Sequence, residues 1–440
     1  MTSELKVFGT DGVRGKVGEY PMTVDFTSRL AGAAASVLAP QGGTVVVWKD
    51  TRISGYMFES ALEAAFVASG LDVILLGPLP TPAISFTIKD CNANFGIVIS
   101  ASHNSYEYNG IKILNNLGEK LDKRLEIDIE KQLSKDPITQ TADTIGRATR
   151  NPNARVSYTK FISKIFNQKR PLKNMKVVVD CSHGAAYKIA PRVLSSLGAD
   201  VIPIGCSPNG YNINLNCGST NVETIAKTVP ALSADLGIAL DGDADRVILI
   251  GPKGNIIEGD HILYILACNT INNHKFNSIV GTILTNSGLE ISLKNKGIQL
   301  YRSDVGDKNV LQLMRQTGSI LGGANSGHII NIDYSPSGDG LMTALLVMKA
   351  MVELGKSIGE LSHGLELMPQ FNHNIETDLT KLSNDLITKL SDEANTNLNN
   401  GRVLVRKSGT EPVLRITVES SDEAHAQKLF ASIKTQINQA

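Results

Sequence analysis

The sequence has no excess of charge of either sign and almost no tryptophan. Its 440 residues include 43 Lys and Arg, 43 Asp and Glu and 1 Trp, so the formal net charge is 0. Non-specific binding to nucleic acid requires a basic electrostatic field, which a neutral chain does not provide. We therefore expect no nucleic-acid partner, while a local basic site for a small anion is compatible with this composition.

Long apolar segments are also missing, and cysteine is scarce. Apolar runs such as Ile262 to Cys268 are far shorter than the ~20 residues of a membrane helix. The first residues, MTSELK, contain no apolar core of a signal peptide. Five Cys at irregular spacing indicate neither a disulfide framework nor a zinc site. We expect a reducing, cytoplasmic compartment and no membrane partner.

The chain does contain enough apolar material for several buried cores. Hydrophobic residues make up 42% of the sequence, and its length is typical of about three domains. One pattern starts three times, at Thr44, Lys176 and Ser278: a strand, a polar loop with Gly, an amphipathic helix, a Gly and a second strand. Each copy is a β-loop-α-β unit, so the pattern predicts three related α/β domains with mixed sheets.

The C-terminal part has a different pattern. Residues 403–420 predict two strands joined by a tight loop, and the segment from Asp422 to Ile437 predicts an amphipathic helix. We expect a smaller α+β domain, in which the polar segment from Leu382 to Asn400 is a solvated helix and loop. Pro residues near three breaks in the pattern place the domains at 1–151, 152–251, 252–369 and 370–440.

The first candidate site is the segment SASHNS, which follows the apolar strand from Phe95 to Ile99 and contains Ser102. A nucleophile on the loop after a strand is a common catalytic arrangement. The adjacent His103 is a poor candidate for the activating base, because neighbouring residues on a strand point to opposite faces. No G-x-S-x-G motif is present either. The alternative is a turn in which Ser and Asn only satisfy backbone groups.

The second candidate site is a loop with three acidic residues, Asp241, Asp243 and Asp245, followed by Arg246. Three carboxylates at alternate positions repel one another unless a cation binds between them. An EF-hand is excluded, since its Gly at position six and Glu at position twelve are Arg246 and Pro252 here. The loop therefore predicts a Mg²⁺ site completed by a phosphate oxygen, with a solvated acidic turn as the alternative.

Two further loops offer hydrogen-bond donors to a ligand. Residues 322–328 combine small residues with Asn325, Ser326 and His328, although a turn with a core His explains this loop equally well. Near the C-terminus, a hairpin loop combines cationic side chains, hydroxyls and backbone amides in a pattern suited to a phosphate dianion. Its candidate ligands are Arg406, Ser408, Gly409, Thr410 and Arg415, and the alternative is an ordinary hairpin loop.

Two isolated cations complete the set. Arg14 lies in the N-terminal segment FGTDGVRG, and Lys112 lies on a strand after Asn109-Gly110. Each alone is compatible with a surface charge. Taken together, the nucleophile, the acidic loop, the polar loop and the phosphate-binding hairpin predict phosphoryl transfer on a small polyhydroxylated substrate.

Nearly the whole chain resembles the α-D-phosphohexomutase superfamily, and above all its bacterial phosphoglucosamine mutases. The resemblance lies in the segments FGTDGVRG, KDTRISGYM, LLGPLPTP, ISASHN, NGIKI, ALDGDADR, VGTILTNSGLE, GGANSGHII, SGDGL and VRKSGTEPVLR. It implies four domains around a central cleft, of which three are α/β and the fourth is different. This agrees with the domain pattern derived above.

The resemblance also implies roles for the candidate residues. Ser102 would be carried as phosphoserine and would ligate one Mg²⁺ together with Asp241, Asp243 and Asp245. Charge stabilisation and acid/base assistance would fall on Arg14, Lys112, Arg246 and His328. The polar loop would supply Asn325 and Ser326 to the sugar. The C-terminal hairpin would bind the non-reacting phosphate through Arg406, Ser408, Gly409, Thr410 and Arg415.

The implied reaction converts glucosamine 6-phosphate into glucosamine 1-phosphate and back through a 1,6-bisphosphate, which also serves as activator. The product would feed the synthesis of UDP-N-acetylglucosamine and peptidoglycan. The resemblance leaves a homodimer open. Two alternatives remain: a phosphoglucomutase or phosphomannomutase of the same superfamily, and a non-catalytic protein that binds sugar phosphates.

The chain departs from the family pattern at several positions. The family has Glu followed by Gln where this chain has Ala324 and Asn325. That Glu accepts hydrogen bonds from two sugar hydroxyls, which an Ala side chain cannot do. Ser105 and Tyr108 replace Pro and Asp in the nucleophile segment, and Lys308 with Asn309 replaces Arg-Tyr. These changes affect contacts to the sugar more than phosphoryl transfer.

Overall fold

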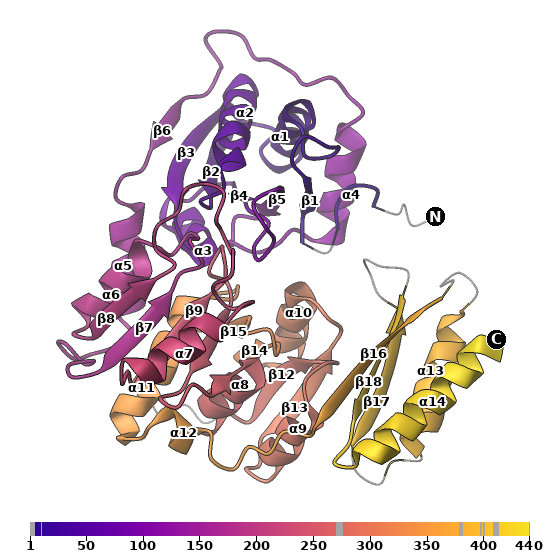
Figure 1. The fold of residues 1–440 in the computed structure, drawn as a ribbon. Helices are drawn as coiled ribbons and strands as arrows, with labels where there is room; N and C mark the ends of the chain where they lie inside the picture. The colour runs from indigo at the N-terminus through magenta and orange to yellow at the C-terminus, as the bar shows by residue number, and fades with distance from the viewer. Residues whose placement is uncertain are drawn as a thin grey trace. The chain divides into compact units, whose positions relative to one another are not determined.

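The computed structural model describes residues 5–9, 11–269, 276–377, 382–396, 398, 401–407 and 413–439 (Figure 1). These residues form two compact units. The first consists of Met1–Leu284 and Leu300–His363, and the second of Thr285–Gln299 and Gly364–Ala440. Among the described helices, none is long and apolar enough to cross a membrane.

The first unit begins with a six-stranded mixed sheet in the order β1-β5-β4-β2-β3-β6. The central β2 is parallel to β3 and β4, whereas β5 is antiparallel to both β4 and β1. The strands are β1 (Val13–Lys16), β2 (Gly43–Lys49), β3 (Leu71–Pro78), β4 (Phe95–Ile99), β5 (Tyr108–Leu114) and β6 (Ala148–Arg150). This order brings the candidate residues on β1, on β5 and after β4 to neighbouring strands.

Alternate side chains of this sheet enter two apolar layers, as expected for a sheet covered on both faces. Val45 and Val47 of β2 belong to the core that contains Phe58 and Phe66 of α2 (Ser54–Ala68). On the other face, a Cβ on Gly96 would lie 2.5 Å from a methyl group of Ile88 in α3 (Thr81–Asp90), so a larger residue there would require Ile88 to shift. The face of the sheet that packs against α2 also carries α1 (Val24–Leu38) and α4 (Lys123–Gln132).

A second sheet in this unit has the order β11-β10-β9-β7-β8 and carries the acidic loop. All five residues of β9 (Leu236–Leu240) and all four of β10 (Val247–Ile250) are buried, and the acidic loop joins these two strands. The other strands are β7 (Lys176–Asp180), β8 (Asp200–Ile204) and β11 (Ile256–Ile257). The helices are α5 (Ala154–Ser163), α6 (Ile189–Ser196) and α7 (Glu223–Ala231).

The third sheet has the order β13-β12-β14-β15 and carries the polar loop of residues 322–328. That loop joins β14 (Leu321–Gly323) to β15 (Ile329–Asn331), which pair antiparallel. The other strands are β12 (Ser278–Thr282) and β13 (Gln299–Ser303). The helices are α8 (Gly259–Cys268), α10 (Asp307–Thr317), α11 (Gly340–Leu354) and α12 (Ile358–Leu361).

The second unit contains an antiparallel sheet in the order β16-β18-β17, together with three helices. The strands are β16 (Gln370–Glu376), β17 (Arg402–Lys407) and β18 (Val413–Glu419), and the helices are α9 (Ser287–Lys294), α13 (Asn384–Thr396) and α14 (Glu423–Gln439). The fold class is therefore as predicted: three α/β sheets and a smaller α+β part with two strands in a hairpin and a C-terminal helix.

The prediction of a solvated helix between 382 and 400 was wrong in one respect. Ile387, Leu390 and Ala394 of α13 are buried in the core of the second unit, against residues such as Val405 and Ile416. These three residues recur at spacings of three and four, so they form one narrow apolar stripe on an otherwise polar helix. The high content of Asn and Asp in the segment concealed this stripe.

Asp339, in the segment SGDGL, gives the fold a testable pH dependence. It is the N-cap of α11, where its side chain accepts a hydrogen bond from the Met342 N–H at 2.9 Å and another from the Tyr158 hydroxyl. Burial raises the pKa of Asp339 to about 6. A raised carboxyl pKa means that folding favours the neutral form, so the protein loses stability as the pH rises from about 4 through about 6.

Asp339→Asn should remove this loss, because Asn keeps an acceptor for the cap and cannot ionise. At about 1.4 kcal/mol per pKa unit, the variant should gain roughly 2–3 kcal/mol relative to the parent between pH 4 and pH 8. Urea unfolding of both proteins at the two pH values measures this difference. A difference that does not change with pH would show that Asp339 is ionised at no cost in the folded state.

Candidate active site

Ser102 lies on the loop that follows β4, and this loop has an unusual backbone conformation. The φ of Ser102 is 50°, which lies in the left-handed region that non-glycine residues seldom adopt. The Ser102 N–H donates to the Ser100 hydroxyl at 2.9 Å, and the Ser102 hydroxyl donates to Oδ2 of Asp241 at 2.6 Å. The predicted nucleophile is therefore buried and in direct contact with the predicted metal loop.

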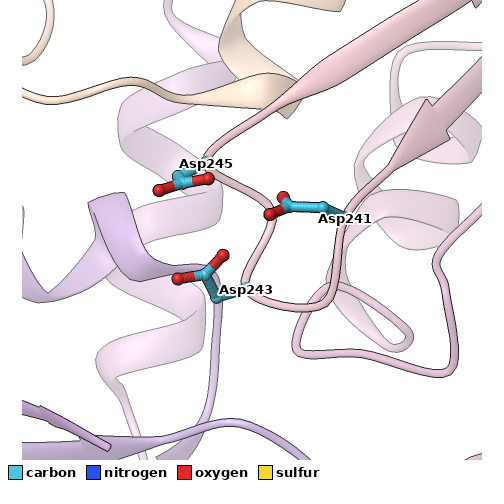
Figure 2. A group of neighbouring side chains, drawn as sticks. All are labelled: Asp241, Asp243 and Asp245. Carbon is cyan, nitrogen blue, oxygen red and sulfur yellow. The ribbon is translucent and has the colours of Figure 1, made fainter. Parts of the chain in front are cut away.

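The three carboxylates of the acidic loop converge, as Figure 2 shows. Asp241, Asp243 and Asp245 are buried, and each offers one oxygen within 4.8 Å of the others. The loop turns at Ala244, whose φ is 58° and whose N–H donates to the Asp241 carbonyl at 3.1 Å. This tight turn is what allows alternate residues of one loop to face a common point.

The charges of this loop are only partly balanced by the protein. Burial, together with the charges of Asp245 and Asp243, raises the pKa of Asp241 well above its usual range. Burial also acts to raise the pKa of Asp245, but neighbouring His328, Lys112 and Arg246 outweigh it and hold that pKa far below its usual range. Among the described residues, Oδ1 of Asp243 is buried and has no hydrogen-bond partner. A bare carboxylate oxygen facing two other carboxylates fits a hard divalent cation.

The predicted cations Arg14 and Lys112 both contact Oδ2 of Asp11. Arg14 pairs with the Asp11 carboxylate and also donates to the Ala101 carbonyl at 3.4 Å. Lys112 lies 3.2 Å from both Asp11 and Asp243. Burial acts to lower the pKa of Lys112, but Asp11 and Asp243 raise it above its ordinary value, so the amine is a cation at neutral pH.

Arg246 follows the three carboxylates of the acidic loop, and His103 follows Ser102 in the nucleophile segment. Arg246 donates its backbone N–H to Oδ1 of Asp241 at 3.1 Å, and its side chain lies 3.8 Å from Asp245. Burial, followed by the charges of Arg246 and Arg14, lowers the pKa of His103 to about 4. His103 is therefore neutral at pH 7, and the Ser102 hydroxyl contacts Asp241, which agrees with the poor prospect of a Ser-His pair.

His328 lies next to the acidic loop. Its Nδ1 is 3.5 Å from Asp245, and its Nε2 accepts a hydrogen bond from the Gly338 N–H at 3.2 Å and lies 3.7 Å from Asp307. Because Nε2 accepts this hydrogen bond, a ring proton lies on Nδ1 and faces Asp245. The nearest groups to both ring nitrogens are thus protein groups, and a direct contact with substrate stays a prediction.

The loop 324–327 rests on the first turn of α8. The Gly259 N–H donates to the Asn325 carbonyl at 3.0 Å, and a Cβ on Gly259 would lie 2.0 Å from the Ala324 carbonyl. Ala324 is half-buried, and Ser326 is exposed. Within the described residues, the Asn325 side-chain oxygen is buried without a hydrogen-bond partner. The loop is thus held by its backbone, which leaves the Asn325 side chain able to bind a ligand.

A cavity of about 420 Å³ opens beside these groups, entirely within the first unit. This volume suits a small-molecule ligand. The residues that line it include Lys112, Asp245 and His328 of the candidate site, the ionisable residues Lys120 and Asp307, and apolar residues such as Leu311 and Ile330.

The phosphate-binding hairpin belongs to the second unit, and Ser408, Gly409 and Thr410 lie outside the described residues. The two arginines are described: Arg406 of β17 and Arg415 of β18 are directly paired across the sheet. Burial and then the charge of Arg415 lower the pKa of Arg406. Two neighbouring cations suit a doubly charged anion, and the binding of phosphate by this hairpin stays a prediction.

Sequence reasoning missed several residues of the site. Asp11 joins Arg14, Lys112 and Lys120, and Lys120 in turn lies 2.7 Å from Asp307. Thr81 donates its hydroxyl to Oδ2 of Asp243 at 3.0 Å and its N–H to the Asp243 carbonyl at 2.8 Å. Asp11 and Thr81 lie in the segments FGTDGVRG and LLGPLPTP, so these motifs were noticed while the individual contacts were not.

Comparison with protein families covers almost the entire chain. Four models of phosphoglucomutase/phosphomannomutase domains match it in order. The α/β/α domain I model matches residues 5–140, domain II 156–254, domain III 258–368 and the C-terminal domain 377–436. Curated relatives match from end to end. Phosphoglucosamine mutase 1 of Shewanella amazonensis is 46% identical over 100% of both chains, and phosphoglucosamine mutase of Pseudoalteromonas translucida is 44% identical over 99% of both.

Solved structures share the fold. A phosphoglucomutase/phosphomannomutase family protein from Burkholderia thailandensis has a TM-score of 0.79 at 22% identity, covering 97% of each chain. The N-acetylphosphoglucosamine mutase of Aspergillus fumigatus, solved with GlcNAc-6P and magnesium, has a TM-score of 0.67 at 16% identity. It covers 98% of this chain, which covers 95% of it. At these identities the likeness concerns the fold.

Proposed function

The chain belongs to the phosphoglucosamine mutases of the α-D-phosphohexomutase superfamily, and we therefore propose that it interconverts glucosamine 6-phosphate and glucosamine 1-phosphate. It is an isomerase that acts by intramolecular phosphoryl transfer. The observation that carries the proposal is the 2.6 Å hydrogen bond between the Ser102 hydroxyl and Asp241, inside a buried group of three carboxylates. Curated relatives at 44–46% identity that carry this name support the substrate.

In the proposed cycle, Ser102 gives and then recovers a phosphoryl group. The bond between phosphorus and Oγ of phosphoserine breaks as a bond to the free O1 of glucosamine 6-phosphate forms, and the proton from O1 ends on Oγ, which becomes a hydroxyl again. The resulting 1,6-bisphosphate turns round, and its O6 phosphoryl group returns to Oγ. Arg14, Lys112 and Arg246 supply positive charge around the transferred group. A closed site would prevent hydrolysis of the phosphoserine between the two halves.

We propose Asp241, Asp243 and Asp245 as ligands of one Mg²⁺, with a phosphoserine oxygen as the fourth. Support comes from the bare Oδ1 of Asp243 and from the convergence of the three carboxylates. When bound, the ion would act as a Lewis acid that withdraws charge from the transferred phosphoryl group. His328, which faces Asp245, would orient that carboxylate and serve in proton transfer.

The phosphate that does not react would bind Arg406 and Arg415, together with Ser408, Gly409 and Thr410. Support comes from the direct cross-strand pairing of the two arginines. Both orientations of the bisphosphate must fit, which a set of cations and amides allows better than a shape-specific pocket. Asn325 and Ser326 would contact sugar hydroxyls. The family resemblance also supports a bisphosphate activator and a cytoplasmic location, and it leaves a homodimer open.

Turnover assays of the purified chain test the proposal. The chain is incubated with Mg²⁺, a trace of glucosamine 1,6-bisphosphate and, in parallel, the 6-phosphates of glucosamine, glucose and mannose. We expect the highest kcat/KM on glucosamine 6-phosphate. Preference for glucose or mannose would replace the proposed substrate by that of a phosphoglucomutase or phosphomannomutase. Absence of turnover on all three would favour a binding protein instead.

Ala324 gives a prediction about the sugar. A hydrogen bond to a charged acceptor is worth ~1.5–3 kcal/mol. Restoring the family's Glu with Ala324→Glu should therefore raise kcat/KM on glucosamine 6-phosphate by roughly ten-fold or more. Phosphoryl transfer to a small non-sugar acceptor should stay the same, because Ser102 and the acidic loop are unchanged. An unchanged or lower kcat/KM on the sugar would mean that Asn325 already supplies this contact.

A further inference from the structure

Two side chains outside the proposed machinery hold the backbone of the nucleophile loop. The Arg52 guanidinium donates through Nη2 to the Ser102 carbonyl at 3.2 Å and to the Asn104 carbonyl at 2.6 Å. The Asn214 amide donates through Nδ2 to the same two carbonyls, at 2.9 Å each. Arg52 lies between β2 and α2 and Asn214 lies in the segment after β8, so two different parts of the fold bind the nucleophile loop.

The Ser102 backbone needs such support. A serine at a φ of 50° is in a conformation that costs free energy and persists only where the surroundings enforce it. The same φ aims the Ser102 hydroxyl at Asp241. If the two carbonyls were released, the loop would relax toward ordinary φ values, and the hydroxyl would move away from the carboxylates.

Arg52 is itself fixed. It is fully buried, pairs with the Asp50 carboxylate and donates its backbone N–H to Asp50 at 2.8 Å. Asp50 also accepts from the Ser100 hydroxyl at 2.6 Å, and Ser100 accepts from the Ser102 N–H. Arg52 and Asp50 therefore hold both ends of the Ser100 to Asn104 segment.

Asn214 connects this loop to the acidic loop. Its N–H donates to the Ser182 carbonyl at 2.9 Å. At Gly242, between two of the carboxylates, a Cβ would lie 2.6 Å from the Ser102 carbonyl and 2.8 Å from the Asn214 amide nitrogen. The nucleophile loop, the acidic loop and the Asn214 side chain thus meet at one point, and only Gly leaves room for this contact.

We propose that Arg52 and Asn214 are positioning residues for phosphoryl transfer: by binding the Ser102 and Asn104 carbonyls they keep the Ser102 hydroxyl against the acidic loop. The inference rests on the proposed role of Ser102 as phosphoryl carrier. The loop must keep one backbone conformation while Oγ alternates between a neutral hydroxyl and a doubly charged phosphate. Four hydrogen bonds to backbone carbonyls do this, because neither their donors nor their acceptors change during the cycle.

Asn214→Gly tests the proposal, with Asn216→Gly as the matched control. Both asparagines lie in the same loop and both have positive φ, 59° and 53°, which Gly adopts without strain. Asn216 is exposed, whereas Asn214 reaches the nucleophile loop. The two variants thus change the backbone in the same way. Asn214→Gly also removes the amide donor to the Ser102 and Asn104 carbonyls, whereas Asn216→Gly does not. Arg52→Lys is a second variant, since Lys keeps the charge next to Asp50 and loses the two-pronged donor.

We expect Asn214→Gly to lower kcat by roughly ten- to a hundred-fold, because displacement of a reacting group by about 1 Å has effects of this size. KM for glucosamine 6-phosphate and Tm should match those of Asn216→Gly. The rate at which glucosamine 1,6-bisphosphate phosphorylates Ser102, followed by intact mass, should fall in parallel with kcat. Arg52→Lys should show the same pattern in kcat if it folds.

An Asn214→Gly variant with the kcat of the Asn216→Gly control would overturn the proposal. So would a loss of kcat that a parallel fall in Tm explains, since that would indicate a purely structural role. Neither result would contradict the proposed function, which is tested separately by the turnover of the parent protein and of Ser102→Ala.

Discussion

Replacing Ser102 with alanine should abolish turnover while the protein stays folded. Within the part of the chain that the structure describes, the Ser102 side chain hydrogen-bonds to Asp241 alone, and its replacement by alanine deletes a single oxygen atom from the site. An enzyme that carries its phosphoryl group on this oxygen has no covalent route without it, so we expect a loss of at least about a thousand-fold in kcat. The measurement is formation of glucosamine 1-phosphate in the presence of Mg²⁺ and a bisphosphate primer.

Ser105→Ala is the matched control for this experiment. Ser105 is exposed and lies three residues further along the same loop, and within the described residues its side chain hydrogen-bonds to Glu107 alone. The control should keep the parent's kcat within about two-fold, since exposed substitutions rarely disturb a site. Intact mass after incubation with the bisphosphate should show an added phosphoryl group on the parent and on Ser105→Ala, and none on Ser102→Ala. Turnover by Ser102→Ala above a trace would remove Ser102 from the carrier role.

The sequence is informative about this site where the chemistry is local. Asp241, Asp243 and Asp245 lie within one loop, so their mutual repulsion and their need for a cation follow from spacing alone. Ser102 follows an apolar strand, and the strand Phe95–Ile99 was predicted with its observed ends. The repeated β-loop-α-β pattern likewise predicted the three sheets, because each unit is contiguous in sequence.

Contacts between distant segments were beyond such reasoning. Arg52 and Asn214 are ordinary polar residues in sequence, and their role depends on meeting the Ser102 carbonyl across 50 and 112 positions. Asp11 was passed over for the same reason: its partners Lys112 and Lys120 lie about a hundred residues away. A sequence without an alignment gives no signal that distinguishes these residues from surface charges.

Asp243→Asn should lower both the affinity for Mg²⁺ and the rate of turnover. The substitution is nearly isosteric and keeps an acceptor for the Thr81 hydroxyl, so the loop should retain its shape. It removes one of three negative charges whose oxygens lie within 4.8 Å. Because affinity for a hard cation depends on the charge of its ligands, we expect Mg²⁺ to bind about ten-fold more weakly or worse, and kcat at a fixed Mg²⁺ concentration to fall by about a hundred-fold.

The stability of Asp243→Asn depends on a contact with Lys112 as well as on the repulsion between the carboxylates. Asp243 also lies 3.2 Å from Lys112, so the variant relieves repulsion from Asp241 and Asp245 but leaves that buried amine with Asp11 as its remaining close partner. These effects oppose each other in the metal-free protein. The rise in Tm on adding Mg²⁺ reports instead on binding of the ion, since a ligand that binds only the folded state stabilises it by an amount that grows with the logarithm of its affinity. That rise should be clearly smaller in Asp243→Asn than in the parent and unchanged in Asp200→Asn, which removes an exposed carboxylate at the start of β8. An equal rise in all three proteins would mean that Mg²⁺ binds somewhere other than this loop.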